Sequence, residues 1–236
     1  MSKIKGTQAI IKCLQEEGVE VIFGYPGGAV IELYDELCKS GIRHILVRHE
    51  QGAVHAADGF ARASGKVGVA LLTSGPGATN GVTAIATAYC DSIPMVVISG
   101  QVPSGVIGQD AFQEVDICGI TMPITKQNFL VNKPEELEQT MHLAFQIARS
   151  GRPGPVLIDV PNDVQKAMIE YQGKKLPALS PKAPDPMRIN LAIDALSKAK
   201  RPVMLVGGGV AISGAQYEAV HLAEKLNLPC ASTLMG

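Results

Sequence analysis

The chain has 236 residues, 46% of them hydrophobic and 18% charged, so it is long and apolar enough to bury a core and is not a disordered chain. Its 21 basic residues balance 22 acidic ones without a basic cluster, which argues against a nucleic-acid-binding surface. The longest apolar runs fall far below the ~20 residues that a membrane-spanning helix needs. Five scattered cysteines without a C-x-x-C pair predict neither a disulfide framework nor a zinc site, and they are typical of a cytoplasmic protein.

Short apolar, β-branched runs alternate with helical patterns, which predicts an α/β fold with a doubly wound parallel sheet. Because these runs do not alternate polar with apolar residues, both faces of the sheet should be covered. In chain order the predicted elements are helix 6–17, strand 19–23, helix 29–40, strand 44–48, helix 51–64, strand 67–73, helix 78–88, strand 95–99, helix 134–150 and strand 155–160. Segment 102–129 is irregular and rich in Pro and Gly, which indicates a long functional loop with a short helix and room for a sixth strand.

A proline- and lysine-rich stretch over 173–186 is typical of a linker. We expect one domain over 1–168, a linker over 169–186, and the beginning of a second, Rossmann-like α/β domain over 187–236. The second unit's pattern predicts helix 190–200, strand 202–206, helix 215–227 and strand 228–232. With only about 50 residues it would leave strand edges and apolar helix faces exposed, so we expect the chain to be the N-terminal part of a longer protein.

Glycine-bearing turns follow two predicted strands, at the sheet edge where open α/β sheets bind ligands. One is Gly24-Tyr25-Pro26-Gly27-Gly28 and the other is Ser74-Gly75-Pro76-Gly77. The second does not have the G-x-G-x-x-G spacing, and no acid follows about 20 residues later, so a dinucleotide-binding fingerprint is a poor fit. The residues alone leave two interpretations open for each turn, a tight connection or a ligand contact.

Glu50 lies where a buried strand is predicted to end and a helix to begin, which places its carboxylate at the positive end of that helix. The position fits a functional acid and equally a plain helix-stabilising acid. His49 and His55 are six residues apart and do not have the H-E-x-x-H spacing of a zinc helix, so we predict no metal site here. No serine has the G-x-S-x-G context of a hydrolase nucleophile.

Taken together, five motifs resemble the thiamine-diphosphate-dependent acetolactate synthases (acetohydroxyacid synthases), in the N-terminal part of their catalytic large subunit. The motifs are Gly24-Tyr25-Pro26-Gly27-Gly28, Arg48-His49-Glu50-Gln51, Thr73-Ser74-Gly75-Pro76-Gly77-Ala78-Thr79-Asn80, Gln109-Asp110-Ala111-Phe112-Gln113-Glu114 and Ser150-Gly151-Arg152-Pro153-Gly154-Pro155. They come in the family's order through essentially the whole chain. The resemblance implies that the first domain binds the pyrimidine of the cofactor and that the second begins the central, FAD-associated domain.

The resemblance also implies a transferase of branched-chain amino acid biosynthesis, which condenses pyruvate, after decarboxylation on thiamine diphosphate, with a second pyruvate or 2-oxobutyrate. It makes Glu50 the catalytic residue, hydrogen-bonded to N1′ of the cofactor's aminopyrimidine. The residues that it places around thiamine diphosphate are Tyr25, Pro26, Gly27, Glu50, Thr73, Pro76, Asn80 and Gln113. Phe112 and Gln113 should face the substrate, and Arg152 should contact FAD.

Further implications concern groups and partners outside these residues. The resemblance implies a homodimer or homotetramer and a small regulatory subunit. It also implies that Mg²⁺ is bound in a C-terminal domain that this sequence lacks, so we expect the chain alone to be inactive. The sequence departs from the family at Asn162, where lysine is common, and this bears on the handling of an acidic substrate. Two other interpretations are another thiamine-diphosphate-dependent 2-oxo acid decarboxylase and a non-catalytic nucleotide-binding module, and the position of Glu50 disfavours the second.

Overall fold

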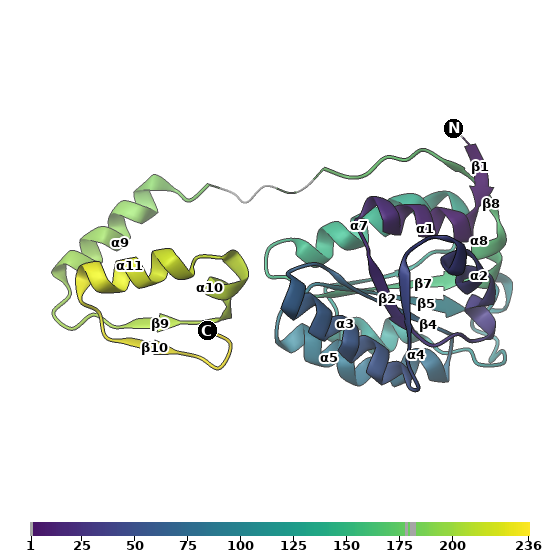
Figure 1. Cartoon of the computed structure of the whole chain (residues 1–236), viewed down its shortest axis with the longest axis horizontal. Helices are drawn as coiled ribbons and strands as arrows, with labels where there is room; N and C mark the ends of the chain where they lie inside the picture. Colours follow the sequence, from purple (N-terminus) through teal and green to yellow (C-terminus); the bar gives the residue numbers. More distant parts are fainter. Residues whose placement is uncertain (1, 178, 180–182) are drawn as a thin grey trace. The chain divides into compact units, whose positions relative to one another are not determined.

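The computed structural model describes residues 2–177, 179 and 183–236, and it divides into two compact units, Met1–Leu179 and Ser180–Gly236 (Figure 1). The larger unit contains a six-stranded parallel sheet with the strand order β3-β2-β4-β5-β7-β6. Its strands are β2 (Val21–Gly24), β3 (Arg43–Leu46), β4 (Gly68–Leu72), β5 (Met95–Gln101), β6 (Gln127–Leu130) and β7 (Pro155–Pro161). The predicted fold class is confirmed, and the sixth strand, β6, begins within segment 102–129 and ends at Leu130.

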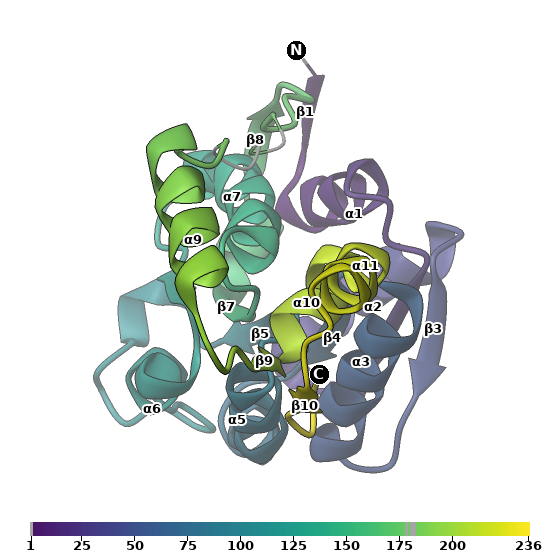
Figure 2. The same ribbon diagram turned by 90° about the vertical axis from the view of Figure 1, so that its left-hand side faces the viewer.

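Helices cover both faces of this sheet (Figures 1 and 2). One face carries α1 (Gly6–Glu16), α2 (Ile31–Lys39) and α7 (Leu137–Arg149), and the other carries α3 (Glu50–Ser64), α5 (Val82–Cys90) and the short α6 (Ile117–Thr121). Successive residues of a strand point to opposite faces, so Val69 joins the first core and Ala70 the second. This is why the inner strands read as unbroken apolar runs.

The edge of the sheet differs from the expectation of burial on both faces. β3 is an edge strand, and its Arg43 and Leu46 are exposed. The predicted helix 78–88 is also two helices, α4 (Pro76–Asn80) and α5. Between them the backbone N–H of Gly81 donates to the carbonyl of Ala78 at 3.0 Å, a tighter turn than an α-helix makes.

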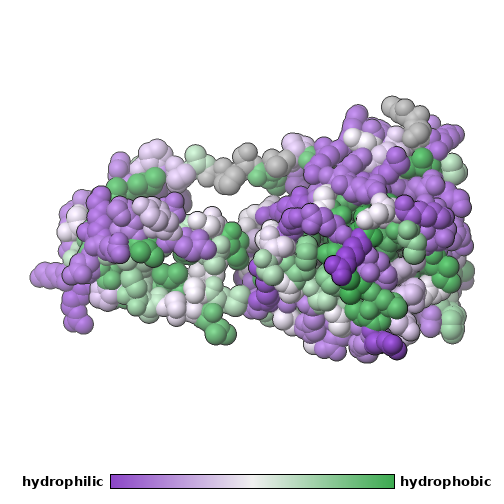
Figure 3. Space-filling model, in the orientation of Figure 1, coloured by the Kyte–Doolittle hydropathy of each residue, from purple (hydrophilic) through white to green (hydrophobic). Residues whose placement is uncertain are grey.

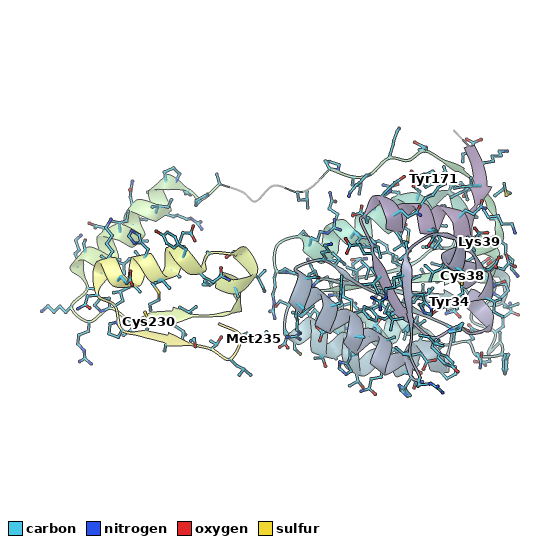
Figure 4. The ribbon with its side chains drawn as sticks, in the orientation of Figure 1. Tyr34, Cys38, Lys39, Tyr171, Cys230 and Met235 are labelled. Atoms are coloured by element: carbon cyan, nitrogen blue, oxygen red, sulfur yellow. The ribbon has the colours of Figure 1, made fainter. Side chains whose placement is uncertain are left out.

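An antiparallel pair, which the sequence pattern did not predict, joins β1 (Ser2–Lys5) to β8 (Met168–Tyr171). Residues 169–171 therefore belong to the larger unit, and the linker predicted over 169–186 starts too early. The hydroxyl of Tyr171, labelled in Figure 4, donates to Glu16 Oε1 at 2.7 Å and so ties β8 to α1. Positions 178 and 180–182 of the predicted linker lie outside the described residues.

The smaller unit consists of α9 (Pro186–Lys198), β9 (Met204–Val206), α10 (Gly208–Ser213), α11 (Gln216–Leu226) and β10 (Cys230–Ser232). The strands pair in parallel, and the predicted order of helices and strands is observed with α10 added. Several of its apolar side chains, Leu205 and Val220 among them, are exposed, as the green areas of this unit in Figure 3 show. Within the described residues no helix has both the length and the apolarity that crossing a bilayer requires.

Strand order reverses between β2 and β4, because the chain leaves β2 toward β3 on one side and β4 lies on the other. A crevice outside the carboxyl ends of the strands is expected at such a point. Tyr34 of α2 donates its hydroxyl to the carbonyl of Leu71 in β4 at 2.9 Å (Figure 4), which binds the helix to the sheet beneath the crevice. A Cβ at Gly24 would overlap with both groups, so only glycine fits at the end of β2. The short α8 (Asn162–Lys166) follows β7 at the same edge.

One acid lies inside the sheet. Asp159 of β7 is 2% exposed and accepts hydrogen bonds from Ser99 Oγ at 2.7 Å and Gln101 Nε2 at 2.9 Å, both on β5. Burial raises the pKa of Asp159 to about 7, although the two hydrogen bonds act to lower it. Since the folded-state pKa exceeds that of the unfolded chain, the contribution of this group to stability is greatest in acid and is lost as the pH rises to about 7.

Replacing Asp159 with Asn removes this titration. Between about pH 4 and pH 8 the wild-type free energy of unfolding should fall relative to that of Asp159→Asn, by on the order of 2–4 kcal/mol in total. Thermal unfolding followed by circular dichroism at several pH values measures the difference, with Asp35→Asn on the exposed face of α2 as a control. A wild-type-to-variant difference that stays constant over this range would contradict the burial of a titrating acid.

Candidate functional site

Glu50 is the first residue of α3 and is only 9% exposed. Its neighbour His49 caps the helix, because its Nδ1 accepts a hydrogen bond from the backbone N–H of Gln51 at 3.2 Å. The side chain of Asn80 donates to Glu50 Oε2 at 2.9 Å. No residue that the structure describes donates to Oε1. One carboxylate oxygen is therefore held in place and the other is available to accept a hydrogen bond.

The turn between β4 and α4 packs closely beside this carboxylate, and we call the surroundings of Glu50 Oε1, Thr73 and Gly77 the recess. A Cβ at Gly77 would lie 2.5 Å from Thr73 Cγ2 and 3.2 Å from Glu50 Oε1. A Cβ at Gly27, in the loop after β2, would lie 2.6 Å from the side chain of Thr73. The two glycines therefore let two turns pack directly against Thr73, where any larger residue would collide with its side chain.

Thr73 also has an unpaired polar atom, which lies beside Gly27. Its Oγ1 is buried and has no hydrogen-bond partner among the described residues. A buried hydroxyl left unpaired costs about 1–3 kcal/mol, which a bound polar ligand would recover. Thr73 Oγ1 and Glu50 Oε1 are thus two polar atoms at this edge of the sheet that have no hydrogen-bond donor or acceptor among the described residues.

The loop between β5 and α6 lies over the same turn. A Cβ at Gly75 would overlap with the carbonyl of Gln113, so the loop backbone rests directly on the β4–α4 turn. Gly75 has φ +57°, and Gln113 has the same φ although it carries a side chain, which is uncommon for a non-glycine residue. Phe112 is 87% exposed and Gln113 is exposed, so both side chains are available at this edge.

Two carboxylates fasten this loop. Glu114 accepts hydrogen bonds from the backbone N–H groups of Gly108 and Ala111, and these bonds lower the pKa of Glu114. Asp163, at the start of α8, accepts from the backbone N–H of Ser104 at 3.0 Å and from its hydroxyl. The loop is thus held to itself through the side chain of Glu114, and to α8 through the side chain of Asp163.

The remaining predicted residues lie at different places. Tyr25 and Pro26 are exposed in the loop after β2, and Pro76 is exposed at the start of α4. Arg152 precedes β7 and therefore lies at the opposite, amino-terminal edge of the sheet, where it donates to Ser92 Oγ at 2.6 Å and to the carbonyl of Cys90 at 3.1 Å. The structure thus brings together Gly27, Glu50, Thr73, Asn80 and the backbone of Gln113, and it places Arg152 elsewhere.

Three residues of this edge have contacts that the sequence pattern did not specify. Gly75 and Gly77 shape the recess, and their signal was the position of both in one turn after a strand. Asn162 donates to the carbonyl of Ala29 at 3.3 Å, so its side chain holds the backbone that follows β2. Across the part of the chain that the structure describes, no three His, Cys, Asp or Glu side chains gather as a metal site would require.

Two protein-family models match the chain. Residues 4–120 match the thiamine pyrophosphate enzyme, N-terminal TPP binding domain, and residues 189–236 match the thiamine pyrophosphate enzyme, central domain. The first match contains Glu50, Thr73 and Asn80, and therefore the recess described above.

Curated relatives align with nearly the whole chain. It is 55% identical to a probable acetolactate synthase large subunit of Methanocaldococcus jannaschii, over 99% of this chain and 41% of that protein. It is 49% identical to the acetolactate synthase of Arthrospira platensis, and 48% identical to the acetolactate synthase isozyme 3 large subunit of Escherichia coli, in both cases over 100% of this chain and 42% of the relative. The chain spans about two fifths of the length of these relatives. On these matches, the chain belongs to the thiamine pyrophosphate enzymes and is similar along its whole length to acetolactate synthase large subunits.

Proposed function

We propose that this chain supplies the pyrimidine-binding side of the active site of an acetolactate synthase. The observation that carries the proposal is the carboxylate of Glu50, with Oε2 held by Asn80 and Oε1 without a donor among the described residues. The relatives, which are named acetolactate synthases, support the choice of reaction. That reaction is the condensation of pyruvate, after loss of carbon dioxide, with a second pyruvate or 2-oxobutyrate.

The recess fits the aminopyrimidine ring of thiamine diphosphate. A carboxylate that accepts, a hydroxyl without a partner, and turns that only glycine can form match a flat ring with both donors and acceptors. When bound, this cofactor supplies the electron sink that allows a 2-oxo acid to lose carbon dioxide. The residues proposed to line its pocket are Tyr25, Pro26, Gly27, Glu50, Thr73, Pro76, Asn80 and Gln113.

Within this proposal Glu50 Oε1 would accept a hydrogen bond from N1′ of the bound ring and would favour a proton at that nitrogen. Asn80 fixes the orientation of the carboxylate, so Oε1 rather than Oε2 faces the ring. The low exposure of Glu50 keeps competing water away, which strengthens a charge-assisted hydrogen bond. Phe112 and Gln113 would stand on the substrate side, since their loop rests on the β4–α4 turn.

The proposal extends to groups outside this chain. Mg²⁺ and the cofactor's diphosphate would be bound by a domain of the intact protein beyond these residues. Arg152, already oriented by Ser92 and Cys90, would meet FAD at the amino-terminal edge of the sheet. The pyrimidine domain, predicted over 1–168, would extend through β8 to residue 171, and 187–236 would be the start of the central domain. The intact protein would be a cytoplasmic homodimer or homotetramer, and the large-subunit names of the relatives support a small regulatory partner.

Glu50→Gln tests the role of the carboxylate. In the intact protein, with thiamine diphosphate, Mg²⁺ and FAD added, acetolactate formation from pyruvate should fall by about 10²-fold or more, because an amide holds a proton on a ring nitrogen far less well than a carboxylate. Separate assays for acetolactate and acetaldehyde distinguish the synthase from a simple decarboxylase.

Glu170→Gln, on the exposed side of β8, is the matched control for Glu50→Gln and should retain wild-type activity. Wild-type rates from Glu50→Gln would refute the catalytic assignment. Release of acetaldehyde without acetolactate by the wild type would instead refute the choice of reaction.

Gly77→Ala tests the recess. The added methyl group would lie against Thr73 and Glu50 Oε1, so the dissociation constant of thiamine diphosphate in the intact protein should rise by about tenfold or more. Calorimetry with the Mg²⁺ complex of the cofactor measures it. Gly59→Ala, in α3 where nothing lies within 4 Å of the added Cβ, should bind like the wild type. Equal affinities for the two variants would place the pyrimidine elsewhere.

A further inference from the structure

A buried polar chain connects the interior of the sheet to the loop that carries Phe112 and Gln113. Gln101 Nε2 donates to Asp159 Oδ2 and to the carbonyl of Val115, both at 2.9 Å. Its Oε1 accepts from the backbone N–H of Val102, also at 2.9 Å. Gln101 is only 3% exposed, so its amide could not form a replacement hydrogen bond with water if one of these bonds were lost.

The two fixed points of the loop lie close together in sequence. Val115 is held by Gln101, and Gln113, two residues earlier, is pressed against Gly75. Between the sheet and the β4–α4 turn, Gln113 is kept at a positive φ of 57°. Such a backbone conformation persists only where its surroundings hold it on both sides.

The presence of an acid at position 159 needs a reason, because a buried carboxylate is destabilising compared with an apolar residue. Among its neighbours, Ser99 only binds the acid, whereas Gln101 also reaches the loop. The other titratable groups near Asp159 are the carboxylate of Asp116 and the thiol of Cys118. Asp116 is engaged instead with the backbone N–H of Gly119 at 2.8 Å.

We propose that Asp159 is a positioning residue of the active site: it holds Gln101, which holds Val115, and this sets where Gln113 and Phe112 stand over the β4–α4 turn. The inference rests on the proposed function, since the loop matters to the reaction only if a 2-oxo acid binds beside it. Asp159 touches neither substrate nor cofactor and acts through Gln101 alone.

Gln101→Met tests this in the intact protein, because methionine keeps the length of the side chain and removes both donors. Amide hydrogen exchange over residues 113–116 should become about tenfold faster or more, while exchange in β4 stays unchanged. The KM for pyruvate should rise about fivefold, because the loop loses its position. The kcat should change less than about twofold, because the position of the Glu50 recess does not change. Tyr171→Phe is the control, because it removes a hydroxyl bond that joins β8 to Glu16 of α1 and not to the loop, and it should change neither quantity.

Asp159→Asn provides a second variant that keeps the shape of the side chain. An ionised carboxylate accepts a stronger hydrogen bond than a neutral one. Wild-type exchange over 113–116, corrected for the intrinsic effect of pH, should therefore slow as the pH rises through about 7, and Asp159→Asn should lack this change.

The outcomes separate the two claims. An active wild type whose Gln101→Met variant has unchanged exchange and unchanged KM overturns the positioning role and leaves the proposed function intact. Faster loop exchange in Gln101→Met, combined with a wild type that forms no acetolactate, overturns the proposed function and still supports the anchoring of the loop by Gln101. A pH-dependent exchange that persists in Asp159→Asn removes Asp159 from the chain of contacts.

Discussion

The close approach of three turns at the carboxyl edge of the sheet is the constraint on which the site depends. Glu50 enters from the start of α3, Thr73 from the end of β4, and Gly27 from the loop after β2. They meet because Gly27 and Gly77 have no side chains to keep the turns apart. The hydrogen bond from Asn80 then decides which oxygen of Glu50 is free. The geometry of the recess thus follows from backbone packing before any ligand is considered.

Features encoded by local pattern were predictable from the sequence. The apolar runs of β4, β5 and β7 and the amphipathic patterns of α1 and α7 predict a covered parallel sheet, as observed. The β1–β8 pair was not predictable, because it joins segments more than 160 residues apart and neither has a strong strand signal. The exposure of β3 was not predictable either, because it follows from the position of this strand at the edge of the sheet and not from its own residues.

In the candidate site, too, the features set by local sequence were predictable and those set by tertiary contacts were not. Glu50 was predicted at a helix start from its position and from the family motif, and it lies there. The unpaired hydroxyl of Thr73 and the contact of Gln113 with Gly75 depend on tertiary contacts that no spacing reveals. Asp159 had a visible signal, a single acid within an apolar strand, but its meaning required seeing Gln101 between it and the loop.

The most direct test of the account is a structure of the intact protein with thiamine diphosphate and Mg²⁺ bound, in which the distance from Glu50 Oε1 to N1′ of the aminopyrimidine is measured. We expect a hydrogen bond of about 2.6–3.2 Å to Oε1, with Asn80 still bound to Oε2. A pyrimidine ring bound outside the recess, or one that faces Glu50 with no nitrogen within about 4 Å of Oε1, would contradict it.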